Sequence, residues 1–260
     1  MQSDLRASFA ELGLQEVVDA AAARELAVNE KFDAEAPYKP ELEDLFSLHS
    51  IVQRTGRTTV LEFGCGWSSL LFAASLSQLR DRLGSLEAYR RNDPFACHCL
   101  DNMERYIAIA RDRIPEAYRA AVTFHHSPVR MTQWNGRIAT EYQTLPLCNP
   151  DLIYLDAPDQ PGVLGEIDGW STRHRDLMPM SCDILKIEHF LTPKTVIIVD
   201  GRAANARFLK CNLQRDWAYR YCARRDQHFF VLEEPPLGKY SKAIIEEVYY
   251  RDGSWTVEDL

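Results

Sequence analysis

Short, nearly continuous apolar runs alternate along this chain with longer stretches in which apolar residues recur every three or four positions. The runs lie at residues 58–63, 94–101, 121–129, 150–159 and 194–202. A continuous apolar run is typical of a strand that is buried on both faces, whereas the longer period is typical of a helix packed on a sheet. The alternation predicts a mostly parallel sheet with helices on both faces.

The intervening segments and the end of the chain complete this pattern. The predicted helices of the sheet lie at 68–84, at 102–115, in the C-terminal part of 167–193, and at 204–217. A pair of strands at 219–226 and 227–234, separated by polar residues, closes the sheet. The predicted fold is therefore α/β: a Rossmann-like, doubly wound, mostly parallel seven-stranded sheet with an antiparallel closing strand and an N-terminal helical extension.

The length of 260 residues suits one large α/β domain. Residues 1–56 are rich in Ala, Leu and Glu at helical spacing, with a second helix that begins after Pro40 and ends at Gly56. We expect this extension to precede a cofactor-binding core at 57–235 and a C-terminal tail at 236–260. The N-terminal helices are candidates for a lid or for the interface of a homodimer.

Charge and composition narrow the partners. A formal net charge of -8 disfavours the binding of a phosphate backbone, so no nucleic-acid partner is expected. No window approaches the roughly 20 apolar residues of a membrane span, and the N-terminus lacks the layout of a secretory signal. A cytoplasmic protein is the resulting expectation. Seven cysteines without a C-x-x-C pair indicate neither a disulfide framework nor a zinc ribbon.

The first apolar run ends in an unusual loop, Gly64-Cys65-Gly66, which leads directly into a helix. Glycines let a backbone approach a ligand closely, and a helix N-terminus favours an anionic group. Glu62, two positions before the first glycine, would oppose a pyrophosphate and favour an ammonium group, which disfavours a nicotinamide enzyme. A ligand with an amino-acid end and a nucleoside end fits both features.

Three features together resemble the class I S-adenosylmethionine-dependent methyltransferases: this loop, the acid Asp101 at the end of the second run, and the sequence of the fourth run. The resemblance covers residues 58–234. The resemblance implies that the loop wraps the methionine portion, that Asp101 and its neighbour hold the ribose hydroxyls, and that Ser127 contacts adenine. The residues that it assigns to the cofactor are Glu62, Gly64, Cys65, Gly66, Trp67, Ser68, Asp101, Asn102, Ser127 and Asp156.

Two features depart from the family pattern. Ser68 replaces the third small residue of the loop, and the distance from Glu62 to Asp101 exceeds the roughly 20 residues usual after a dinucleotide loop. Glu87 is therefore a rival for the ribose-binding acid. Asp101 is preferred because the sequence after it has the apolar stripe of the helix that a βα unit requires.

Transfer of a methyl group to oxygen requires an aligned acceptor and a group that takes its proton. The catalytic candidates after the fourth and fifth runs and in the loop between them are Asp156, Asp159, His174 and Asp200. Asp156 and Asp200 also resemble the metal ligands of cation-dependent O-methyltransferases. Because Gly201 stands where those enzymes have an asparagine, Asn205 would supply the amide to Mg²⁺ or another divalent cation. The alternative is that both acids line an acceptor pocket without metal.

Arg173, Arg175 and Arg202 follow the same strands and could hold an anionic acceptor, a small molecule or a glycan. The first hypothesis is therefore a methyltransferase acting on an oxygen of a small molecule or sugar. An aminopropyltransferase on the same fold would need a strongly acidic acceptor pocket, which this arginine cluster disfavours. A third hypothesis is a binding module with a degenerate site, which the intact glycine loop disfavours.

Overall fold

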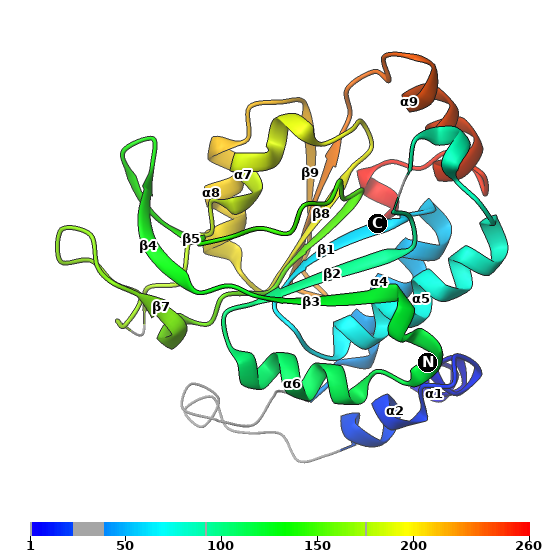
Figure 1. Ribbon diagram of the computed structural model, residues 1–260, viewed down its shortest axis with the longest axis horizontal. Helices are drawn as coiled ribbons and strands as arrows, with labels where there is room; N and C mark the ends of the chain where they lie inside the picture. The colour runs from blue at the N-terminus through cyan, green and yellow to red at the C-terminus, as the bar shows by residue number, and fades with distance from the viewer. Residues whose placement is uncertain (1, 23–38, 92, 175) are drawn as a thin grey trace.

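The computed structural model describes residues 2–22, 39–91, 93–174 and 176–260. Part of the first predicted helix, at 23–38, and Arg175 lie outside the described residues. The main feature of the fold is a seven-stranded sheet with the strand order β3-β2-β1-β6-β8-β10-β9 (Figure 1). The strands are β1 (Thr59–Phe63), β2 (Ala96–Asp101), β3 (Val122–His126), β6 (Leu152–Leu155), β8 (Val196–Asp200), β9 (Trp217–Cys222) and β10 (Gln227–Leu232).

The pairing of these strands confirms the predicted α/β fold. β1 lies parallel to both β2 and β6, β2 is parallel to β3, and β6 is parallel to β8. β10 runs antiparallel to both of its neighbours, β8 and β9. The direction of winding reverses between β1 and β6, and in such sheets a ligand crevice opens there at the carboxyl ends of the strands.

Helices cover both faces of the sheet because alternate residues of each strand point to opposite sides. In β1, Val60 joins a core with Leu48 and Leu70, and Leu61 joins a second core with Ile184 and Leu209. The first core also contains residues close to both ends of the chain. The helices are α1 (Gln2–Glu11), α2 (Gln15–Ala21), α4 (Leu42–Thr55), α5 (Trp67–Leu83), α6 (Glu104–Arg113), α7 (Asp183–Ile187), α8 (Ala203–Asn212) and α9 (Lys239–Ile244).

Of the helices in the described ranges, none combines the length and the apolar character that crossing a bilayer requires.

Helix α4 packs beside α5, where His49 Nδ1 and Ser75 Oγ lie 2.8 Å apart. It ends at Gly56, whose left-handed conformation (φ 62°) lets its N–H bond the Val52 carbonyl and turns the chain into β1. The predicted end of this helix is thus confirmed. Since α4 leads into the amino end of β1, its first turn lies at the carboxyl edge of the sheet.

A second, three-stranded sheet was not predicted. It consists of β4 (Val129–Trp134), β5 (Arg137–Tyr142) and β7 (Val163–Leu164) and projects from the main body (Figure 1). Asn135 and Gly136 connect β4 and β5 and both have positive φ, 48° and 73°. An Asn-Gly pair between two short strands is a strong hairpin signal, which makes this turn recognisable in the sequence.

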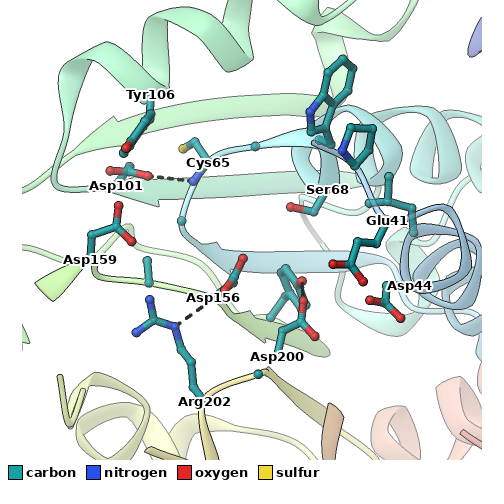
Figure 2. Close-up of a pocket in the computed structure, with 18 of the residues that line it drawn as sticks. Glu41, Asp44, Cys65, Ser68, Asp101, Tyr106, Asp156, Asp159, Asp200 and Arg202 are labelled. Carbon is teal, nitrogen blue, oxygen red and sulfur yellow. Dashed lines mark hydrogen bonds and ion pairs between the residues drawn. The ribbon is translucent and has the colours of Figure 1, made fainter. Parts of the chain in front are cut away.

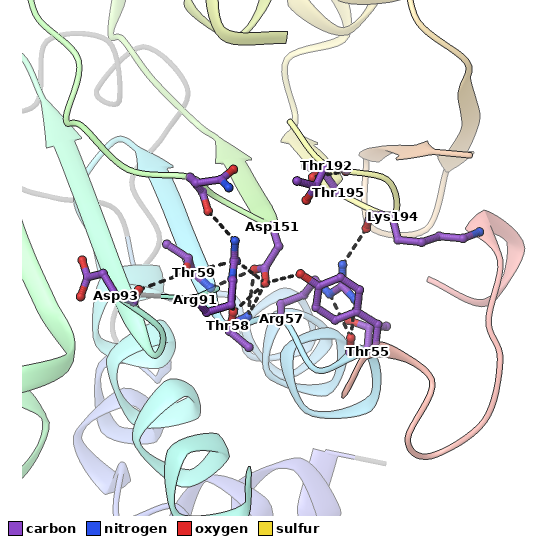
Figure 3. A network of polar contacts seen from close by, with 12 residues as sticks. Thr55, Arg57, Thr58, Thr59, Arg91, Asp93, Asp151, Thr192, Lys194 and Thr195 are labelled. Atoms are coloured by element: carbon purple, nitrogen blue, oxygen red, sulfur yellow. Dashed lines mark hydrogen bonds and ion pairs between the residues drawn. The ribbon is translucent and has the colours of Figure 1, made fainter. Parts of the chain in front are cut away.

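The amino edge of the main sheet is held by the fully buried Asp151, directly before β6 (Figure 3). Its carboxylate accepts hydrogen bonds from the backbone N–H groups of Thr58 and Thr59, at 2.8 and 2.9 Å. Arg91 Nη2 and the Tyr249 hydroxyl also donate to it, at 2.7 and 3.0 Å. One buried carboxylate thereby joins the starts of two central strands to the C-terminal segment.

Candidate active site

A cavity of about 600 Å³ opens at the carboxyl ends of β1, β2, β6 and β8. The loop after β1, the acids that end β2 and β8, the segment after β6 and the first turn of α4 form its walls (Figure 2). The cavity therefore lies where the reversal of strand order predicts a ligand.

The loop after β1 depends on Gly64, which has φ +100°. A Cβ atom at this position would lie 2.9 Å from Ala157 Cβ and 3.2 Å from the Asp156 carbonyl oxygen. The conformation and the contact with the neighbouring strand end both require glycine. Gly66 then precedes α5, and its N–H donates to Ser69 Oγ at 3.1 Å.

Asp101 ends β2 and is 4% exposed. Its Oδ2 accepts a hydrogen bond from the Cys65 N–H at 2.8 Å, and its Oδ1 accepts one from the Met103 N–H at 2.7 Å. Desolvation raises the pKa of this carboxyl to about 6, against the lowering effect of these bonds. The rival acid, Glu87, lies in a short helix before β2 and does not line the cavity.

Four other residues assigned to the cofactor, Cys65, Trp67, Ser68 and Asn102, also line the cavity. Asn102 is positioned by a hydrogen bond of 3.1 Å from its Nδ2 to the Gly162 carbonyl. These residues come from the loop after β1, the first turn of α5 and the end of β2, so the structure gathers most of the predicted cofactor set on one wall.

Glu62 and Ser127 lie behind that wall, and both are fully buried. Glu62 Oε2 accepts a hydrogen bond of 2.6 Å from the Ser69 hydroxyl, and burial raises the pKa of its carboxyl well above the usual range. Ser127 Oγ accepts a hydrogen bond of 2.9 Å from the Thr144 N–H. Neither side chain has surface in the cavity, so Glu62 acts on the loop through the first turn of α5.

Asp156 follows β6, Asp200 ends the neighbouring strand β8, and the two lie together on the cavity floor (Figure 2). Desolvation first, and then the Asp200 charge, raise the pKa of Asp156 to about 8, although its side chain is 54% exposed to the cavity. Because this exposed side of Asp156 lies inside the cavity, its carboxyl is still partly desolvated. Arg202 Nε lies 3.7 Å from Asp156 Oδ1, and the Tyr154 hydroxyl donates to Asp200.

The opposite wall carries two acids that sequence reasoning missed, Glu41 at the N-cap of α4 and Asp44 in its first turn. Desolvation, followed by the Asp200 charge, raises the pKa of Asp44 to about 7. Acids in the first turn of a helix are common because they complement its dipole. The sequence therefore contained no signal that separates these two from ordinary helix-stabilising acids.

The predicted catalytic residues are only partly brought together. Asp159 lines the cavity with Asp156 and Asp200. His174 does not: its side chain is 66% exposed, and its Nδ1 accepts a hydrogen bond of 3.2 Å from the Asp176 N–H. Arg173 is exposed on the same loop, so Arg202 is the one member of the predicted arginine cluster that the described residues place in the cavity.

Asn205 does not join Asp156 and Asp200. It is fully buried, its Oδ1 accepts a hydrogen bond of 3.1 Å from the Ser181 N–H, and its Nδ2 donates to the Ser181 carbonyl at 3.3 Å. Both ends of its amide are therefore occupied, and the predicted set of hard oxygen ligands is not assembled. Across the described ranges, one group of three acidic, thiol or imidazole ligands lies within 4.8 Å, namely Glu62, Cys97 and Cys99.

No protein-family model matches the sequence, and no curated protein sequence shows significant similarity to it. Several solved structures are similar in backbone. The O-methyltransferase TomG from Streptomyces achromogenes, involved in tomaymycin synthesis and in complex with S-adenosylmethionine, is 15% identical with a TM-score of 0.45, covering 84% of this chain and 89% of that chain. An O-methyltransferase from Bacillus cereus in complex with S-adenosylhomocysteine is 15% identical with a TM-score of 0.43, covering 85% of this chain and 90% of that chain.

Cofactor-bound Rv0187 from MTB is 12% identical with a TM-score of 0.43, covering 85% of this chain and 88% of that chain. Similarity at this level says nothing about activity or acceptor. The Rossmann-like fold of this chain is established by its own strand order and register, and by the cavity at the carboxyl ends of the strands.

Proposed function

We propose that this protein is an S-adenosylmethionine-dependent methyltransferase that acts on an oxygen of a small-molecule or sugar acceptor. The observation that carries the proposal is the hydrogen bond from the Cys65 N–H to Asp101. It fixes a glycine loop and a helix N-terminus beside an acid at the end of the neighbouring strand. A ligand with a carboxylate at one end and vicinal hydroxyls at the other matches this pair of features.

The cavity surfaces fit such a cofactor. Apart from its chain neighbours, Ser68 Oγ at 4.0 Å is the one atom of the described residues that a Cβ at Gly66 would meet, so a ligand can approach the backbone there closely. Helix α5 begins at the next residue, and its N-terminal dipole favours a carboxylate. Each Asp101 oxygen accepts one backbone bond and keeps a lone pair for a ribose hydroxyl.

When bound, S-adenosylmethionine supplies a methyl carbon on a positively charged sulfur. The chain must then hold an acceptor hydroxyl in line and take its proton. Asp156 is the group best placed for this role, because it lies on the cavity floor and its pKa is raised to about 8. A carboxylate with a raised pKa is a stronger base than an ordinary one.

An aminopropyltransferase is the second candidate, and the acids of the cavity favour it. Glu41, Asp44, Asp159 and Asp200 could hold an amine substrate. The two candidates differ in their cofactor, since an aminopropyl donor is the decarboxylated form of S-adenosylmethionine. It lacks the carboxylate that the N-terminus of α5 favours.

Calorimetric titration with S-adenosylmethionine, its decarboxylated form and NAD tests the proposal. We expect S-adenosylmethionine to bind most tightly. Preference for the decarboxylated form would support the aminopropyltransferase, and preference for NAD would overturn both candidates. Binding of none of the three would leave a non-catalytic module with a degenerate site.

A further inference from the structure

The walls of the cavity are unusually acidic for a site expected to hold an anionic acceptor. Among the described lining residues, the carboxylates outnumber the cations. The acids are Glu41, Asp44, Asp101, Asp156, Asp159 and Asp200, and the cations are Lys39, Arg113 and Arg202. The Arg113 guanidinium lies over the Trp67 ring, 3.8 Å from its centroid. It thus belongs to the cofactor wall, the side of the cavity that carries most of the predicted cofactor residues. The remaining part of the cavity, here called the acceptor half, therefore contains more carboxyl groups than cations, and it opposes an anionic acceptor even with Asp44 and Asp156 partly protonated.

The acids of this half are spread over two walls. Glu41 and Asp44 lie at the N-cap and in the first turn of α4, and Asp200 lies across from them at the end of β8 (Figure 2). The Asp200 charge disfavours the ionised forms of both Asp44 and Asp156. In the described residues no three of these carboxylates lie within 4.8 Å of one another, so they form no compact cage for a bare metal ion. An ammonium group donates several hydrogen bonds in different directions and suits acids placed apart.

Arg202 provides an independent observation on the same cavity. Its side chain is 7% exposed, and its Nε and Nη1 have no hydrogen-bond partner among the residues that the structure describes. The contact with Asp156, at 3.7 Å, is an ion pair too long for a hydrogen bond. Buried donors without a partner are costly, so these nitrogens point to a ligand oxygen beside Asp156.

We propose that the acceptor is an amino alcohol, a molecule with an ammonium group and a hydroxyl group on one carbon skeleton. The ammonium group lies between Asp44 on α4 and Asp200 on β8, and the hydroxyl oxygen lies against Arg202 and Asp156. This assignment rests on the proposed methyltransferase function, since it names the acceptor of that same site. It replaces the anionic acceptor expected from the predicted cluster of Arg173, Arg175 and Arg202.

Three sugars that differ in charge on the same ring test this assignment: D-glucosamine, D-glucose and D-glucuronate. Their binding to the full-length protein is measured by saturation-transfer NMR, at neutral pH, with S-adenosylhomocysteine present and divalent cations chelated. We expect glucosamine to bind at least about tenfold more tightly than glucose, and glucuronate to bind most weakly. Equal binding of the three, tighter binding of glucuronate, or binding of none overturns the assignment.

Variants of neighbouring residues on α4 locate the ammonium site. Asp44→Asn should remove most of the preference for glucosamine over glucose and leave glucose binding unchanged. Glu43→Gln is the matched control, because Glu43 lies outside the cavity and its Oε2 faces Arg224 Nε at 3.8 Å. Thermal unfolding of both variants shows whether the fold is retained. An unchanged preference in folded Asp44→Asn contradicts the assignment.

Calorimetry with S-adenosylmethionine separates this inference from the proposed function. If the protein binds S-adenosylmethionine and the sugar ranking fails, the amino alcohol is wrong and the methyltransferase proposal stands. If the protein does not bind S-adenosylmethionine, the proposed function itself falls.

Discussion

The Asp101 carboxylate and the backbone N–H of Cys65 are joined by a hydrogen bond of 2.8 Å, which ties the end of β2 to the loop after β1. Because the two strands are parallel neighbours, Glu62 stands in register with Cys99, and the loop meets the acid one strand over. A shift of either strand by one residue would turn the acid to the other face of the sheet. The cofactor wall therefore depends on the register as well as on the residues.

The first prediction concerns cofactor affinity. Asp101→Asn replaces charge-assisted hydrogen bonds to the ribose with neutral ones, at a cost of about 1.5–3 kcal/mol, or roughly 10- to 150-fold in the dissociation constant. Calorimetric titration with S-adenosylmethionine measures the change. Glu87→Gln is the control, because Glu87 does not line the cavity, and it should bind as the wild type does. Equal losses in both variants would contradict the placement of the site.

The Asp101 carboxyl also predicts that the binding of S-adenosylmethionine depends on pH. Its pKa is raised to about 6, chiefly by desolvation. Above this value Asp101 is a carboxylate that accepts hydrogen bonds from ribose hydroxyls, and below it the protonated form loses part of that capacity. Affinity for S-adenosylmethionine should thus fall as the pH drops through about 6. Titrations across this range should show the fall in the wild type and a flat profile in Asp101→Asn.

The third prediction tests the loop. Gly64→Ala introduces a Cβ at 2.9 Å from Ala157 Cβ in a conformation with φ +100°. The combined strain and overpacking should lower the free energy of unfolding by about 2–4 kcal/mol and weaken cofactor binding. Gly136→Ala is the matched control, because Gly136 also has a positive φ, 73°, but a Cβ there would lie within 4 Å of no atom in the described part of the chain, its chain neighbours aside. Urea denaturation should show the larger loss for Gly64→Ala, and equal losses would mean that backbone strain alone matters.

The fourth prediction concerns stability at the opposite edge of the sheet. Asp151→Ala leaves Arg91 buried without its carboxylate partner, and such losses cost about 3–5 kcal/mol. Asp252→Ala removes an ion pair of similar length, 2.8 Å to Arg82, that lies on the surface, and it should cost less than about 1 kcal/mol. Urea denaturation of both variants makes the comparison. Similar losses would show that the Asp151 network contributes little.

Asp151 also predicts how stability depends on pH. Burial alone would raise the pKa of this carboxyl, but the charges of Arg91 and Arg57 and its hydrogen bonds hold it below the usual value. A carboxyl with a lowered native pKa stabilises the fold above its unfolded pKa and loses that contribution as the pH falls. The wild type should therefore lose more stability below about pH 4 than Asp151→Asn does, as measured by denaturation at several acidic pH values.

A last prediction concerns metal. Since both ends of the Asn205 amide are bonded to Ser181, we expect methyl transfer to persist after exhaustive chelation. The assay follows a labelled methyl group into the acceptor with and without chelator. Loss of activity that Mg²⁺ restores would instead make Asp156 and Asp200 ligands of a divalent cation.

Local patterns in the sequence are enough to predict the central sheet, the loop after β1 and the acids at the strand ends. Apolar periodicity reports which faces of a segment are buried, and a polar residue after a buried run must lie at an edge of the sheet. This is why Asp101, Asp156 and Asp200 could be placed at the cavity before the structure was known. The Asn135-Gly136 hairpin was equally readable in the sequence but was missed.

Which polar side chains meet depends instead on how distant segments of the chain pack. Asp44 and Asp200 line the same cavity although α4 and β8 lie far apart in the chain. They meet because α4 packs along α5 and leads into β1. Loop paths turned His174 outward, and packing buried Glu62 and Asn205. Such positions depend on contacts between distant segments, and no local pattern records them. The acidic lining of the cavity is for this reason a property of the assembled fold.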